Sequence, residues 1–229
     1  MVRDGLVAAG LELARTGGPD AVVLREATRM VGVVPNAAYR HFADRDELLA
    51  AVCTAAMREL AARMAAGVAR VRGKYGDPDA AQRRLQAIGV AYLEFAHEEP
   101  GLFATAFALP QRHAYGVPDG GSRATPAGGR RGAPAGGSRG TPDGVSGDAM
   151  TAETGQVRMP LDQLRAALDE LVDAGVLDRR RRDGTEYPIW SAVHGLAVLT
   201  GAGPLRDVPE ATRRRLEELT FAFIEEGLT

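Results

Sequence analysis

The segment 24–52 limits the possible folds most, because its pattern predicts two short helices joined by a glycine turn and followed by a third helix. Apolar residues recur at helical spacing over residues 24–31, and Gly32 stands where a left-handed residue would end that helix. Pro35 suits the first turn of the next helix, predicted over residues 35–41, because its φ is already helical and its missing N–H needs no partner there. Two such helices are a form that enters the major groove of DNA.

The third helix of this segment has its own start signal. Asp44 and Glu47 have the spacing of a capping box, and an apolar helix face begins at Leu48. An earlier amphipathic stretch, residues 3–14, predicts a helix that packs across the other three. We therefore predict an N-terminal helix-turn-helix domain over residues 1–50.

The same residues resemble the DNA-binding domain of TetR-family transcriptional regulators. The resemblance is carried by Leu24-Arg25-Glu26-Ala27, Val31-Gly32-Val33, Ala37-Ala38-Tyr39-Arg40-His41-Phe42 and Asp44-Arg45-Asp46-Glu47-Leu48-Leu49. Val23 and Val34 depart from the pattern, because such domains usually place Ser or Thr at these helix N-caps. Valine cannot accept the unpaired N–H groups, so each departure costs about 1 kcal/mol of local stability and removes a hydroxyl that could bind phosphate.

The resemblance implies a role for particular side chains on DNA. Arg25 would bind guanine O6 and N7, Asn36 would pair with adenine, and Ala37 would meet a thymine methyl group. Tyr39, His41 and Arg45 would bind phosphates. The expected DNA-binding residues are Arg25, Pro35, Asn36, Ala37, Tyr39, His41 and Arg45. Two alternatives stay open at this point: Tyr39 could belong to the core, and Arg25 could pair with Glu26 or Asp20.

The charge balance argues mildly against DNA binding. The formal net charge is -2, and residues 1–50 hold six arginines against seven acidic residues. The alternative function is a helical small-molecule binding protein that does not recognise DNA. No secretory signal and no apolar run long enough to span a bilayer is present, so we expect a cytoplasmic protein without a membrane partner.

Residues 51–229 predict a second helical domain, so the expected fold class is all-α. Helical stripes recur from residue 51 to residue 109 and again from residue 159 onward. Between them, a Gly-, Pro- and Arg-rich repeat of eight residues lacks any apolar stripe, which predicts a disordered insertion over residues 111–157. A basic arm that touches DNA phosphates is the alternative for its arginines, which are Arg123, Arg130, Arg131 and Arg139.

The second domain has more large apolar side chains than a single helical layer needs. The run Trp190-Ser191-Ala192-Val193-His194-Gly195 resembles the Trp and His-Gly (WHG) signature of one class of TetR-family C-terminal domain. We expect an effector pocket lined by Tyr92, Phe95, Phe103, Phe107, Trp190 and His194. The alternative is that these side chains only fill the core.

The resemblance also implies an assembly and a mode of regulation. The last two helices, around residues 190–200 and 209–227, would pair with their copies in a homodimer. Such a dimer would place two recognition helices about 34 to 36 Å apart on a palindromic operator. A small-molecule effector that favours a different spacing would release the DNA. Repression is the usual action of the family, so the resemblance implies a repressor.

Signals for enzyme chemistry are weak. The four histidines lack acidic or cysteine partners at metal-ligand spacing on a helix, apart from the Glu98 and Glu99 neighbours of His97 at a helix end. The single cysteine, Cys53, excludes an internal disulfide and any multi-cysteine metal site. No phosphate-binding glycine loop or nucleophile elbow occurs. We therefore expect no catalytic residue, metal site or cofactor.

Overall fold

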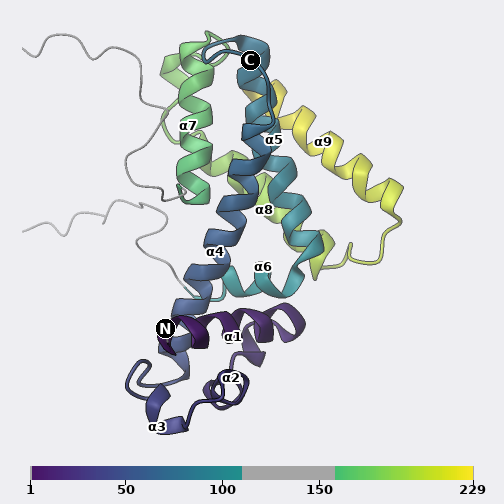
Figure 1. Cartoon of the computed structure of the whole chain (residues 1–229). Coiled ribbons are helices and arrows are strands. Elements are labelled where there is room, and N and C mark those ends of the chain that lie inside the picture. Colours follow the sequence, from purple (N-terminus) through teal and green to yellow (C-terminus); the bar gives the residue numbers. More distant parts are fainter. Residues whose placement is uncertain (1, 110–157, 229) are drawn as a thin grey trace, which may run out of the picture. The chain divides into compact units, whose positions relative to one another are not determined.

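The computed structural model describes residues 2–109 and 158–228, which fold into helices only (Figure 1). The α-helices are α1 (Val2–Gly17), α2 (Leu24–Val31), α3 (Pro35–Ala38), α4 (Arg45–Ala69), α5 (Pro78–Glu98), α6 (Pro100–Ala106), α7 (Pro160–Asp173), α8 (Glu186–Gly201) and α9 (Glu210–Leu228). Two short 3-10 helices are η1 (Pro19–Ala21) and η2 (Arg179–Arg181). The predicted all-α class is confirmed. The predicted insertion 111–157, with its four arginines, lies outside the described residues.

The N-terminal head, which we define as α1, η1, α2, α3 and the start of α4, has a small apolar core. Buried side chains from all four α-helices meet there, and they include Leu6, Val22, Leu24, Ala27, Ala38, Phe42 and Leu48. The guanidinium of Arg3 lies over the ring of Phe42, 5.2 Å from its centroid. Phe42, in the turn that follows α3, therefore packs inside the core of the head.

Helix α3 is shorter than its sequence predicts. The helix expected over residues 35–41 ends at Ala38, because the backbone N–H groups of His41 and Phe42 both donate to the Ala38 carbonyl and form a turn. Phe42 is 1% exposed, so the chain bends inward here to bury that ring. Burial of the aromatic side chain outweighs continuation of a helix whose N-cap, Val34, offers no acceptor.

Helix α4 starts as the capping-box spacing predicts. The Asp44 carboxylate accepts from Glu47 N at 2.8 Å, and the Glu47 carboxylate accepts from Ala43 N at 2.6 Å. Helix α5 starts in the same way, since Asp77 accepts from Ala80 N at 2.8 Å before the proline at the first helical position. Both starts satisfy N–H groups that a helix cannot satisfy itself.

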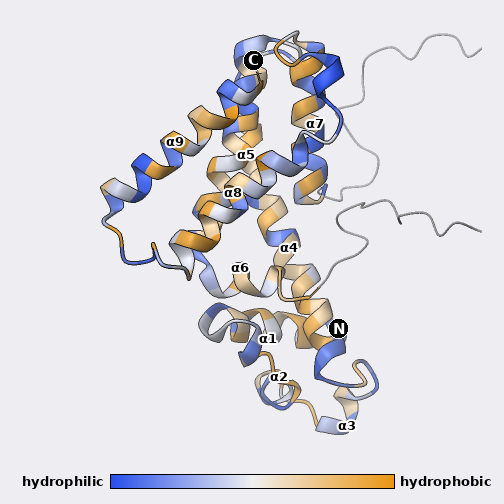
Figure 2. Cartoon of the chain, turned by 180° about the vertical axis from the view of Figure 1, so that it is seen from behind, coloured by the Kyte–Doolittle hydropathy of each residue, from blue (hydrophilic) through white to orange (hydrophobic). Residues whose placement is uncertain are grey.

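Helix α4 leaves the head and packs against α5, α6 and α7, which together with α8 and α9 form the body (Figure 1). The apolar stripe of α5 is buried there, as its spacing predicts. Figure 2 shows that α9 lies at the edge of the body and carries apolar residues among polar ones. The described residues of head and body belong to one compact unit.

Candidate nucleic-acid interface and ligand cavity

The turn between α2 and α3 has the geometry that its glycine predicts. Gly32 is left-handed, with φ 73° and ψ 29°. The backbone N–H groups of Gly32 and Val33 both donate to the Thr28 carbonyl, at 3.0 and 3.1 Å. The Thr28 hydroxyl donates to the Arg25 carbonyl at 2.7 Å. These bonds satisfy carbonyls at the end of α2 and set the direction in which α3 begins.

Most side chains with an expected DNA role are exposed on the head. Arg25, Pro35, Asn36 and His41 lie in solvent, and Ala37 is half-buried. Tyr39 is 58% exposed, so the structure does not bury it in the core. For Arg25, one of the two alternative partners is otherwise engaged, because the Glu26 carboxylate accepts from Arg29 Nε at 2.9 Å. The structure thus gathers the six residues on or beside α2 and α3.

Arg45 differs from the other six because its guanidinium is bound within the head. Its Nε donates to the Val22 carbonyl at 3.0 Å, and its Nη2 donates to the Pro19 carbonyl at 2.8 Å. The carboxylates of Asp20 and Asp46 lie 3.9 and 3.7 Å from its nitrogens. Arg45 therefore ties the loop before α2 to the start of α4, a role that the sequence pattern did not indicate.

The two N-cap valines are both accessible to solvent. Val23 precedes α2 and is 39% exposed, whereas Val34 precedes α3 and is 69% exposed. Both have the extended backbone of an N-cap residue. Neither side chain has an oxygen that could accept a hydrogen bond from the first N–H groups of its helix.

In the body, five of the expected pocket residues pack against one another as an aromatic cluster, in which Trp190 meets Phe107 edge-on. The Tyr92 hydroxyl lies 2.8 Å from His194 Nδ1, and Phe103 meets Tyr92 edge-on with ring centroids 5.5 Å apart. The ring centroids of Phe107 and His194 lie 4.8 Å apart. Burial lowers the pKa of His194, which favours the neutral imidazole in its hydrogen bond with Tyr92.

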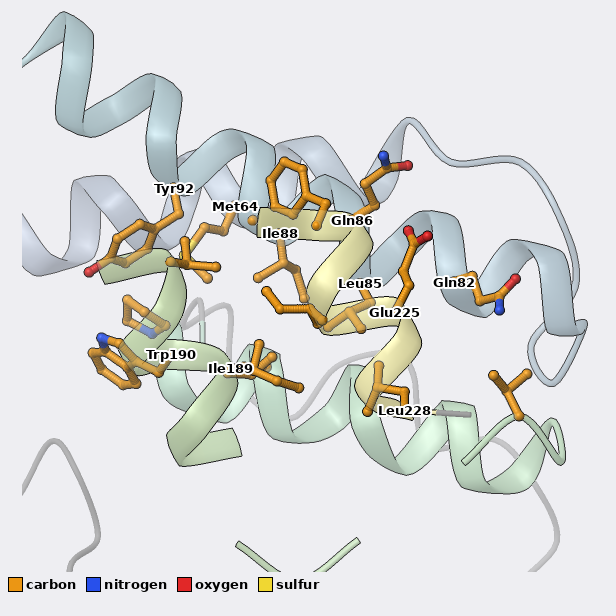
Figure 3. A pocket seen from close by; sticks show the side chains of 17 residues that line it. Met64, Gln82, Leu85, Gln86, Ile88, Tyr92, Ile189, Trp190, Glu225 and Leu228 are labelled. Carbon is orange, nitrogen blue, oxygen red and sulfur yellow. The ribbon is translucent and has the colours of Figure 1, made fainter. Parts of the chain in front are cut away.

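A cavity lies beside this cluster, between α4, α5, α7, α8 and α9 (Figure 3). Of the expected pocket residues, Tyr92 and Trp190 line it, and they lie at one end in Figure 3. Phe95, Phe103, Phe107 and His194 are outside its lining. Most of the lining is apolar and includes Met64, Leu85, Ile88, Leu164, Ile189, Val193, Phe221, Ile224 and Leu228.

Aliphatic residues rather than aromatic ones therefore define most of this cavity. Their helical spacing in the sequence predicts core positions and does not distinguish a residue that lines a cavity. The apolar face of α9 was the one additional sequence feature that could have indicated these lining residues. Gln82, Gln86 and Glu225 add polar groups from α5 and α9 (Figure 3). The free volume is about 60 Å³, which holds a few water-sized molecules.

Helix α6 joins the body to the head by a close backbone contact. A Cβ atom at Gly101 would lie 2.2 Å from the Ala14 carbonyl oxygen and 2.6 Å from that of Arg15. The Arg15 guanidinium donates to Glu99 at 2.5 Å and to Glu59, on α4, at 2.8 Å. The end of α1 is thus held by both α4 and the start of α6.

A head with an exposed glycine-linked pair of helices, held by a long helix to a body that contains a cavity, defines a helix-turn-helix DNA-binding protein. Residues 6–52 match the family model described as bacterial regulatory proteins, tetR family. Residues 6–52 therefore match the DNA-binding domain of TetR-type transcriptional regulators. The WHG assignment of the body stays a prediction.

The fold of the whole chain also has a match among solved structures. A structure titled "Structure of a protein with unknown function from Rhodococcus sp. RHA1" has a TM-score of 0.62 and 20% sequence identity. The match covers 100% of this chain and 95% of that one. At this identity the likeness concerns the fold alone. No match was found among curated proteins.

Within the described ranges, no three His, Cys, Asp or Glu side chains gather as a metal site requires. None of the helices in those ranges combines the length and apolar composition needed to cross a bilayer.

Proposed function

We propose that this regulator is a repressor that binds a palindromic operator as a homodimer and leaves it when an apolar small molecule occupies the cavity. The observation that carries the proposal is the exposure of Arg25, Asn36, Tyr39 and His41 on the two helices of the family-matched head. Arg25 and Asn36 would bind base edges, with Pro35 and Ala37 beside them. Tyr39 and His41 would bind phosphates, and Arg45 would add a phosphate contact from the half of its side chain that faces solvent.

The cavity supports a ligand of mostly apolar surface. Its few polar groups, the amides of Gln82 and Gln86 and the carboxylate of Glu225, would orient one polar end of such a ligand. Because the free volume is small, a larger ligand has to displace α8 or α9 from α5. Binding therefore changes the arrangement of the helices around it.

Two routes connect that change to the head. Met64 lines the cavity on α4, the same helix whose first turn belongs to the head. The aromatic cluster joins Tyr92 to Phe103 on α6, and α6 abuts the end of α1 at Gly101. An effector that prefers one arrangement of α4 and α6 would change the spacing of two heads in a dimer.

The dimer is supported by apolar side chains that α8 and α9 leave in solvent. Val198 and Leu199 on α8, and Leu219 and Phe223 on α9, are all exposed. A second copy of the chain would cover them by two-fold pairing of the same helices. Such pairing would place two recognition helices in successive major grooves.

The first experiment tests DNA recognition. Purified protein is incubated with a pool of random duplexes, and the retained fraction is sequenced. We expect a palindrome whose base preference relaxes in Arg25→Ala but not in Arg215→Ala, which removes an exposed arginine of α9 that pairs with Glu218. Affinity should fall steeply with salt. Recovery of no common sequence would contradict the proposal and favour a small-molecule binding protein without DNA recognition.

The second experiment uses Trp190, the single tryptophan of the chain, as a reporter inside the cavity. Apolar compounds that occupy the cavity should change its fluorescence and release the operator at the same concentrations. Val193→Phe fills the cavity and should weaken both effects, whereas Val90→Phe, at an exposed position of α5 outside the lining, should not. Operator release without any change at Trp190 would place the effector elsewhere.

A further inference from the structure

We infer that Val34, with Pro35 beside it, recognises the methyl groups of thymines in the operator. The inference rests on the proposed DNA binding and adds to it the chemistry of one contact. Val34 lies within the family-matched residues, at the N-cap of α3, and it presents two methyl groups where no side chain caps the helix.

Exposure is the first observation. Val34 is 69% exposed, more than the other exposed large apolar residues of the head, which are Val23, Met30 and Tyr39. Pro35, the next residue, is also exposed. Val34 and Pro35 thus form an exposed apolar pair at the start of α3, in the family-matched helix-turn-helix.

Local stability gives no reason for valine at this place. The backbone of Val34 has N-cap geometry, with φ -69° and ψ 144°, and its carbonyl accepts from Ala37 N at 2.9 Å. A serine would fit this geometry and would also satisfy an N–H group of α3. Both the missing cap and the exposed methyl groups are unfavourable in the free protein, so a favourable contact in a complex would account for the residue.

The chemistry of the major groove supplies one matching group. Base edges there present hydrogen-bond donors and acceptors, and the C5-methyl group of thymine is the apolar exception. A valine or proline side chain that covers this methyl group removes both from water. Cytosine in the same place lacks the methyl group, so the valine would lose this contact.

The test compares two versions of the operator recovered from the random pool, one with thymine and one with uracil in its place, which removes only the methyl groups. Wild-type protein should bind the thymine duplex about fourfold more tightly for one contacted methyl group, and about fifteenfold for one in each half-site. Val34→Ser should bind both duplexes with nearly equal affinity while its thermal unfolding temperature stays the same or rises, because serine caps α3.

Val23→Ser is the matched control, since it makes the same replacement at the N-cap of α2, outside the recognition helix. It should keep the preference of the wild type for thymine. Equal binding of both duplexes by the wild type, an undiminished preference in Val34→Ser, or half-sites without thymine would each overturn the inference while leaving DNA recognition intact. Recovery of no operator would overturn it together with the proposed function.

Discussion

Arg45 illustrates what sequence spacing can and cannot say about a single side chain. Helix-start rules place Asp44 and Glu47 correctly, because a cap concerns neighbours within one turn. The carbonyls that bind the Arg45 guanidinium belong to Pro19 and Val22, more than twenty residues earlier. That partnership depends on how α1 and η1 pack, so it follows from tertiary structure and not from local pattern.

His194 provides a prediction about pH. Burial lowers its pKa below the ordinary value of 6.5, so the folded protein holds fewer protons than the unfolded chain once the pH falls below that value. Stability is therefore fully present above about pH 6.5 and declines as the pH falls from there toward the lowered pKa of the folded state. Urea unfolding of the wild type between about pH 7.5 and about pH 5.5 should show this decline.

The variant His194→Gln removes the titrating group and should flatten that pH dependence, although it costs some stability at neutral pH. His97→Gln, at the exposed end of α5, is the control and should keep the slope. An identical slope in wild type and His194→Gln would show that another group causes the decline.

At the scale of elements, amphipathic stripes predict the helices well, and three-dimensional packing decides what they enclose. Aromatic side chains suggested a pocket, yet Phe95 is fully buried beneath the Arg63 guanidinium and the other rings mostly pack on one another. The cavity lies where Gly89 lets Phe221 of α9 approach α5. The apolar stripes of α5 and α9 do not predict where these two helices cross, because the helices are far apart in the sequence.

The joint between α1 and α6 leads to a prediction for Gly101→Ala. The new Cβ would overlap backbone carbonyls of α1, which cannot rotate away as a side chain can. We expect a loss of about 1 to 3 kcal/mol in the free energy of unfolding, measured with urea. This steric cost should exceed the gain of about 0.5 to 1 kcal/mol that alanine normally brings to a helix.

Gly195→Ala separates these two effects. A Cβ at Gly195, also within a helix, would meet no described atom within 4 Å, so this variant should be as stable as the wild type or slightly more stable. Equal stability of the two variants would show that α6 moves away from α1 at little cost.

A buried ion pair joins α5 to α7 and gives a second prediction at this scale. Arg84 and Glu170 are in direct contact, and the Arg84 guanidinium also donates to the Gly73 carbonyl at 2.6 Å. Glu170→Ala leaves a buried guanidinium without its carboxylate, so we expect a loss of about 3 to 5 kcal/mol in unfolding free energy. The joint replacement of Arg84 and Glu170 by methionine should recover part of this loss, because it buries no unpaired charge.

Glu218→Ala is the comparison for an exposed pair. Its carboxylate accepts from Arg215 at 3.1 Å in solvent, and its removal should cost less than about 1 kcal/mol. Similar losses for Glu170→Ala and Glu218→Ala would mean that water reaches the Arg84 guanidinium when its partner is removed.

For the whole molecule, the sequence predicts an all-α regulator, but it does not predict which apolar residues of α8 and α9 face solvent. Stripes on α8 and α9 identify apolar residues without distinguishing those that face the body from those that face solvent. Ile224 is buried, whereas its neighbour Phe223 is 72% exposed, and this division depends on how α9 lies on α5 and α8. The exposed set becomes visible only in the folded chain.

That exposed set leads to the prediction for assembly. Phe223 would lie near the middle of a two-fold interface, with Leu219 one turn before it and Val198 and Leu199 on the adjoining helix. Phe223→Glu would place two like charges in an apolar interface and would remove two aromatic anchors. We expect a folded monomer by analytical ultracentrifugation, with unchanged helix content by circular dichroism.

Loss of the dimer should also weaken binding to the full operator, while binding of one head to one half-site should stay the same. A monomer contacts one half-site at a time, so it lacks the gain in effective concentration that a second, linked head provides. We therefore expect Phe223→Glu to bind a single half-site as tightly as the wild type does, but to gain little from the full palindrome. Ala222→Glu adds the same charge to the neighbouring exposed position, about 100° around α9, and should remain dimeric. A dimer of Phe223→Glu with full operator affinity would show that the chains associate through another surface.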